Sequence, residues 1–135
     1  MYPTKKEILE SPFQIDEETL DVINVWKIQY LKNLKKKTNL KKIIEISSLL
    51  LFLTPRRSVW IELGNTYCYK TTSPTIVLNK HKPSLISALH ELGHHLYGDS
   101  ELEACRFSIW IFKTCFPEFY EKLEWKGHLL VKKEK

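Results

Sequence analysis

Residues 84–98 read Ser-Leu-Ile-Ser-Ala-Leu-His-Glu-Leu-Gly-His-His-Leu-Tyr-Gly, and this stretch decides how the rest of the chain is interpreted. Its pattern predicts a helix over residues 84–97, with Ser84 as the N-cap and Gly98 as the residue that ends it. The buried stripe of this helix consists of Leu85, Ile86, Leu89 and Leu96. Gly93 in a helix interior costs about 1 kcal/mol relative to alanine. We therefore expect another element to pack closely against the helix at this point.

His90 and His94 are four residues apart and share one face of the predicted helix, so both imidazoles can bind a single metal ion. Glu91 lies about 100° round the same helix, where its carboxylate can reach a water at the metal. This His-Glu-x-x-His spacing predicts zinc-assisted hydrolysis of a peptide bond, with Glu91 as the general base. The alternative is an amphipathic helix whose histidines make ordinary hydrogen bonds.

A zinc site of this kind needs a third protein ligand, and few residues after His94 can supply it. The candidates are His95, Asp99, Glu101, Glu103 and, further along, His128. If a second helix begins near Ser100, Glu101 lies in its first turn and can face back to the metal. Glu103 lies about 200° round that helix from Glu101, so the two carboxylates are not expected to share one ion.

The residues around the two carboxylates favour Glu101. It shares a helix face with the small side chains of Ala104, Cys105 and Ser108, which suit close packing beside the motif helix. Glu103 is the second choice. The methionine-turn class of zinc protease is excluded, because its third histidine would fall at Ser100 and the only methionine is Met1. We therefore predict one zinc ion held by His90, His94 and Glu101, with water in the open position.

The remaining pattern predicts an α+β fold in a single domain spanning residues 1–135. Residues 1–57 form an N-terminal helical part, 58–117 the sheet and the metal-site helices, and 118–135 a C-terminal helix with a basic tail. The predicted helices span 17–36, 84–97, 100–113 and 118–125, and the predicted strands span 59–63, 66–70 and 75–78. The apolar run of 40–53 fits a helix or a strand, and a helix is preferred. Gly64-Asn65 predicts a hairpin between the first two strands, and Ser73-Pro74 a turn before the third.

Three stretches together resemble the ImmA/IrrE-type metallopeptidase domain: TIVLN at 75–79, LISALHELGHHLYG at 85–98 and SELEACRFSIWIF at 100–112, followed by the CFP of 115–117. The resemblance covers roughly residues 58–117. It implies a gluzincin-like, zincin-type fold in which helices pack around a small three-stranded sheet. It also implies that Glu101 is the third ligand. Ser108 stands where the family pattern has alanine, and no DNA-binding helix-turn-helix is evident.

Composition places this chain among ordinary globular proteins, because 43% of its 135 residues are hydrophobic and 27% are charged. The chain has neither an apolar run of membrane-span length nor a secretory signal, so no membrane partner is expected. Three cysteines, Cys68, Cys105 and Cys115, are odd in number and predict a reduced, cytoplasmic protein. The net charge of +5 and the lysines of 32–42 and 132–135 allow contact with nucleic acid, although a solvated helix end and a basic tail are the simpler explanation.

Three functions follow from these features. The first is a small zinc metallopeptidase acting on a peptide or protein substrate, which would lie along an edge strand, 75–78 or a neighbour. The second is a metal-binding regulatory or interaction module with weak proteolysis or none. The third is a nucleic-acid-associated protein with a structural metal. Candidate oxyanion stabilisers are Tyr67, Tyr69, His95, Tyr97 and His128. Neither the substrate nor the oligomeric state follows from the sequence.

Overall fold

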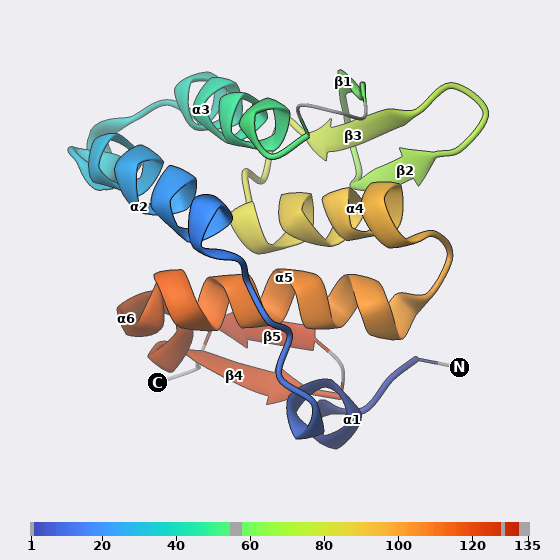
Figure 1. The fold of residues 1–135 in the computed structure, drawn as a ribbon. Helices are drawn as coiled ribbons and strands as arrows, with labels where there is room; N and C mark the ends of the chain where they lie inside the picture. Colours follow the sequence, from blue (N-terminus) through green and yellow to red (C-terminus); the bar gives the residue numbers. More distant parts are fainter. Residues whose placement is uncertain (1, 55–57, 128, 133–135) are drawn as a thin grey trace.

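A computed structural model of the chain describes residues 2–54, 58–127 and 129–132. Within these ranges the chain has an α+β fold with six α-helices, a three-stranded sheet and a separate two-stranded hairpin. Two antiparallel helices, α4 (Leu85–Tyr97) and α5 (Glu101–Cys115), form the centre of the molecule. The three-stranded sheet and α3 cover one side of α4, whereas α1 and the C-terminal hairpin cover the far side of α5 (Figure 1). The α4–α5 pair is therefore shielded on both sides.

The N-terminal part is helical, as predicted, and packs against this centre. It contains α1 (Lys5–Glu10), α2 (Glu17–Leu31) and α3 (Asn39–Phe52). The sequence did not indicate α1. The helix predicted over 17–36 ends at Leu31, because Asn33 takes the left-handed conformation with φ +56°, and only a 3-10 turn (Leu34–Lys36) follows. The helix preferred for 40–53 is confirmed.

The core formed by these helices is apolar. In α3 the buried side chains are Ile43, Ile46, Leu49 and Leu50, and they join Ile23 of α2 and the inner faces of α4 and the sheet. Trp26 of α2 donates a hydrogen bond from its indole nitrogen to the carbonyl of Glu45 at 2.9 Å, which ties α2 to α3. In the part of the chain that the structure describes, no helix has the length and apolar character needed to cross a membrane.

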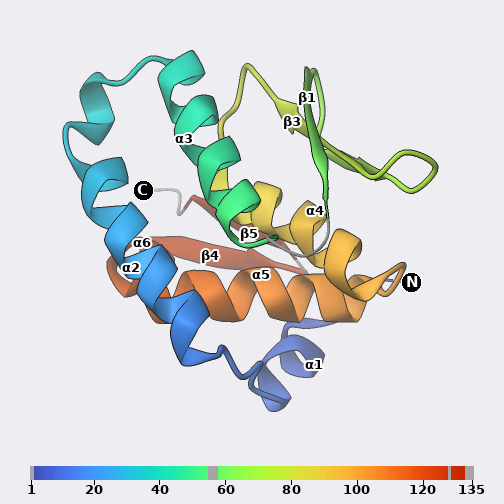
Figure 2. The same cartoon turned by 45° about the horizontal axis from the view of Figure 1, so that its top comes forward.

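The three predicted strands all form, but their order differs from the prediction. The strands β1 (Trp60–Gly64), β2 (Cys68–Lys70) and β3 (Thr75–Asn79) lie in the order β1-β3-β2. β3 is parallel to β1 and antiparallel to β2, so the hairpin predicted at Gly64-Asn65 is wrong. The reason is burial: the first four residues of β3 are all buried, and a strand buried along its length needs neighbours on both sides. The view in Figure 2 shows β1 and β3 running side by side.

The C-terminal part also differs from its prediction. The helix expected over 118–125 is only α6 (Pro117–Glu121), and the chain then forms a hairpin of β4 (Leu123–Lys126) and β5 (Leu129–Lys132). Residues 123–126 alternate between apolar and charged, which is the strand period and which the helix assignment overlooked. Trp125 and Leu130 from this hairpin pack with Ile8 of α1 over Cys105 and Ile109 of α5.

Candidate metal centre

The motif helix α4 has well-defined ends that agree with the sequence. Ser84 is its N-cap, and its hydroxyl oxygen accepts a hydrogen bond from the Ser87 amide at 3.2 Å. Gly98 follows the helix with φ +85°, and its amide donates to the His94 carbonyl at 2.9 Å. A positive φ of this size favours glycine. These two caps fix the length of α4 and therefore the position of its histidines.

Gly93 allows α5 to approach α4 very closely. A Cβ placed on Gly93 would lie 2.9 Å from the Ala104 Cα and 3.2 Å from its carbonyl oxygen. These atoms belong to the α5 backbone, so the contact leaves no room for a side chain. The expectation of close packing at Gly93 is confirmed. Ser100 caps α5 by accepting from the Glu103 amide at 3.2 Å, so Glu101 is the first residue of this helix.

The two helices bring His90, His94 and Glu101 together. Glu101 Oε1 lies 2.8 Å from His94 Nε2, and Glu101 Oε2 lies 3.1 Å from His90 Nε2. One possible ligand atom from each residue lies within 4.8 Å of the others. Tetrahedral zinc at ordinary bond lengths keeps its ligand atoms about 3.3 Å apart. The donor atoms are therefore close enough together to bind a single zinc ion.

The second nitrogen of each histidine also has a partner. His94 Nδ1 lies 2.9 Å from the Gly98 carbonyl oxygen, which accepts a hydrogen bond from Nδ1–H and so leaves the Nε2 lone pair for a metal. For His90 the partner is a thiol, because Nδ1 lies 3.8 Å from Cys105 Sγ. Burial, and secondarily the charge of Glu101, raise the pKa of the Cys105 thiol to about 12, so this contact is to a neutral thiol at ordinary pH.

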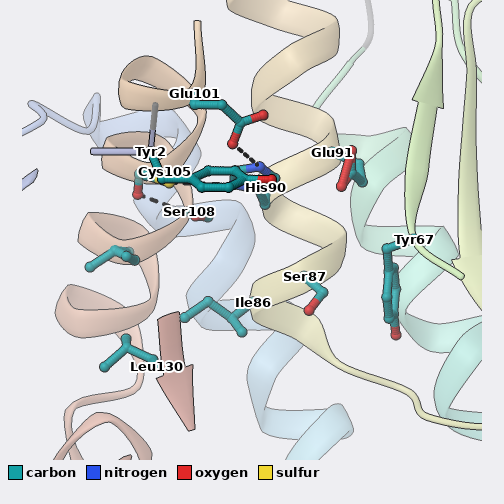
Figure 3. A pocket seen from close by; sticks show the side chains of 11 residues that line it. Tyr2, Tyr67, Ile86, Ser87, His90, Glu91, Glu101, Cys105, Ser108 and Leu130 are labelled. Atoms are coloured by element: carbon teal, nitrogen blue, oxygen red, sulfur yellow. Dashed lines mark hydrogen bonds and ion pairs between the residues drawn. The ribbon is translucent and has the colours of Figure 1, made fainter. Parts of the chain in front are cut away.

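Glu91 has a buried carboxyl group at the edge of this group of residues. Its residue is 9% exposed, and burial raises the pKa of its carboxyl above the usual value. The charge of Glu101 raises this pKa further, whereas His94 lowers it. Figure 3 shows Glu91 on the side of α4 that faces the strands, while His90 points towards Glu101. The side chain is thus next to the metal-binding atoms without being one of them.

Among the residues that the structure describes, the other candidates for the third ligand do not join the group of His90, His94 and Glu101. The Glu103 carboxylate lies 3.9 Å from the Arg106 guanidinium, on another side of α5 from Glu101. His95 Nδ1 lies 2.8 Å from the Tyr69 hydroxyl. Asp99 lines a cavity with the three grouped residues, and His128 lies outside the described residues. The geometry therefore agrees with the predicted set of His90, His94 and Glu101.

The three tyrosines among the candidate oxyanion stabilisers differ in their exposure and in the hydrogen bonds of their hydroxyl groups. The Tyr67 hydroxyl donates to the Lys82 carbonyl at 2.6 Å and accepts from the Ser84 amide at 2.7 Å. The Tyr67 hydroxyl proton is therefore already donated to a backbone carbonyl just before α4. Tyr97 is exposed and stacks edge-on against Phe13. Tyr69, joined to His95, remains at the cavity wall.

Two cavities border the metal-binding residues His90 and Glu101. One of about 410 Å³ lies between them and β2, with Tyr67, Cys68 and Tyr69 in its wall. The other, of about 420 Å³, lies towards α5 and reaches Tyr2 and Leu130 (Figure 3). Both include His90, Glu91 and Glu101. Tyr2 and Leu130 were not predicted to line this site, because neither residue belongs to a motif that links it to the metal-binding helices.

The lysine-rich segment is partly structural. Lys37 pairs with Glu45 at 2.7 Å and donates to the Tyr30 carbonyl, also at 2.7 Å, at the end of α2. The side chains of Lys32, Lys35, Lys36 and Lys41 are exposed. The segment therefore holds the α2–α3 connection together and also presents positive charge at the surface.

Comparison with known proteins adds no relative: no family model, no curated protein and no solved structure matches the chain.

Proposed function

We propose that the chain is a zinc-dependent metallopeptidase of the ImmA/IrrE type, with a gluzincin-like fold. The observation that carries this proposal is the meeting of three zinc-type ligands, from two helices, beside the buried carboxylate of Glu91. His90, His94 and Glu101 would hold the ion. Bound zinc supplies a Lewis acid that activates a water and polarises the peptide carbonyl.

Glu91 has the properties of the proton carrier in such a reaction. It would accept a proton from the attacking water and deliver it to the leaving amine. Burial raises the pKa of its carboxyl, which brings the acid closer to the pH at which it must both accept and donate a proton. A structural zinc site has no use for a buried carboxylate in this position.

The peptide substrate would bind along β2. The sequence predicted 75–78 or a neighbouring strand as the edge, but β3 is the central strand of the sheet, so the neighbour β2 is the better choice. Within the described sheet β2 pairs only with β3, and its other edge borders the cavity that contains the metal-binding residues. An extended peptide can add to such an edge through backbone hydrogen bonds.

The location proposed for the protein is the cytoplasm. Cys68, Cys105 and Cys115 are all free thiols, which agrees with a reducing compartment.

Substitution of Glu91 tests the reaction directly. The Glu91→Gln protein should bind zinc as the parent does and lose peptide cleavage, measured on a peptide mixture by mass spectrometry with zinc content measured in the same samples. His94→Ala should lose the metal. Glu103→Gln is the matched control and should change neither, because its carboxylate faces Arg106.

Two results would contradict this proposal. Cleavage that survives in zinc-loaded Glu91→Gln would remove Glu91 from the mechanism. A parent protein that binds zinc and cleaves nothing would instead support the metal-binding interaction module. Binding of nucleic acid through the exposed lysines would be a separate result, measured with labelled DNA and RNA at several salt concentrations.

A further inference from the structure

A third cavity, of about 390 Å³, lies next to the metal centre and has a different character. It is bounded by the ends of α2 and α5, the starts of α3 and α4, the short helix α6 and the β4–β5 hairpin. Its wall is mostly apolar and aromatic, with Leu34, Phe112 and Phe119 among its residues. Lys42 is the one charged side chain among the described residues that line it. A size of a few hundred cubic ångströms and an apolar wall with a few polar groups are typical of ligand pockets.

This cavity borders the one at the metal centre. Ile86 and Leu130 line both the 390 Å³ cavity and the 420 Å³ cavity that contains His90, Glu91 and Glu101. Figure 3 shows Ile86 and Leu130 on the side of His90 away from Glu101. Ser84 and Pro83, at the start of α4, lie in the wall of the third cavity alone. The two cavities therefore follow one another along α4, from the metal centre to the start of the helix.

We propose that the third cavity, the Phe119 groove, binds a bulky apolar side chain of the peptide substrate about three residues from the bond that is cut. The inference rests on the proposed peptidase function. His90 and Ser84 are six residues apart on α4, which is about 9 Å along the helix axis. An extended peptide covers this length with about three residues, at about 3.3 Å each. Lys42 then favours a carboxylate next to that apolar side chain.

Peptides of matched sequence provide the probe. One set carries Phe, Leu or Gly three residues from a common cleavage site, on either side of it, and a second set adds Asp or Lys next to the Phe. The parent should cut Phe and Leu peptides at least 10-fold faster, in kcat/KM, than the Gly peptide on one side of the cut, because a filled apolar pocket gives selectivity of this order. Phe119→Ala should bring this ratio close to one. Because the readout is a ratio within one protein, partial loss of folded enzyme does not affect it.

Charge reversal tests the role of Lys42. Lys42→Glu should reverse the preference for Asp over Lys next to the Phe. Lys41→Glu is the matched control, because Lys41 occupies the adjacent position in the first turns of α3 and is exposed outside the groove. It should retain the parent's preference.

The outcomes separate the groove from the peptidase activity. Equal cleavage rates for the Phe and Gly peptides, whichever side of the cleavage site carries the varied residue, would overturn the Phe119 groove and would not affect the proposed peptidase function. A zinc-loaded parent that cuts none of the peptides would refute the peptidase, and with it a substrate as the occupant. A dimer in sedimentation experiments that Phe119→Ala dissociates would assign the groove to a second copy of the chain and overturn the proposal.

Discussion

Replacing Gly93 with alanine should separate α4 from α5 and weaken the metal centre. The new Cβ would lie 2.9 Å from the Ala104 Cα. Non-bonded carbons are favourable at about 3.5–4.0 Å, so α5 has to move by roughly 0.6–1 Å. Overpacking of this kind costs about 1–3 kcal/mol. Alanine returns about 1 kcal/mol through its higher helix propensity. We therefore expect a loss of about 1 kcal/mol in the free energy of unfolding, or roughly 4 °C in Tm.

Gly93→Ala should weaken the affinity for zinc more than it lowers the free energy of unfolding. Glu101 lies three residues before Ala104 on α5, so it moves with the displaced helix, whereas both histidines remain on α4. Metal–ligand distances tolerate deviations of about 0.2 Å, and the expected shift exceeds this. The affinity for zinc, measured by competition with a chromogenic chelator, should fall at least 10-fold.

Ala104→Gly is the matched control for Gly93→Ala. It also costs about 1 kcal/mol, through helix propensity, but it introduces no clash and should keep the zinc affinity. The double variant should not recover zinc binding, since removing the Ala104 Cβ relieves only a 3.3 Å contact and leaves those to its Cα and carbonyl oxygen. A Gly93→Ala protein that is more stable than the parent and binds zinc equally well would refute this reasoning.

Three further predictions concern single side chains. Glu101→Gln should lower the zinc affinity at least 10-fold while Glu103→Gln leaves it unchanged, as measured by chelator competition; equal losses would contradict the choice of ligand. At pH 8 a disulfide reagent should modify Cys68 before Cys105, because burial raises the pKa of the Cys105 thiol to about 12, and peptide mapping that finds Cys105 modified first would be inconsistent with this. Tyr67→Phe should reduce the free energy of unfolding by about 1–2 kcal/mol, because it leaves the Lys82 carbonyl and the Ser84 amide without their partner; an unchanged urea midpoint would show that water replaces the hydroxyl.

The predictions that failed share a cause. The order of the three strands was wrong because turn residues at Gly64-Asn65 suggested a local hairpin, whereas burial of β3 on both sides requires it to be central. The helix predicted through residue 125 stops at Glu121, because the next residues pair as a hairpin that covers α5. In both regions contacts between distant segments outweighed the local pattern.

The sequence alone determined the motif helix, its caps and the shared face of His90 and His94, because spacing along one helix is a local property. It also narrowed the third ligand to a few side chains. Only the tertiary structure decided that Glu101 meets both histidines while Glu103 meets Arg106, since this depends on how α5 is rotated against α4. The two helices approach most closely where Gly93 faces the Ala104 backbone, a contact that a side chain at residue 93 would prevent. The cavities around the centre also depend on packing, because residues from both ends of the chain form their walls.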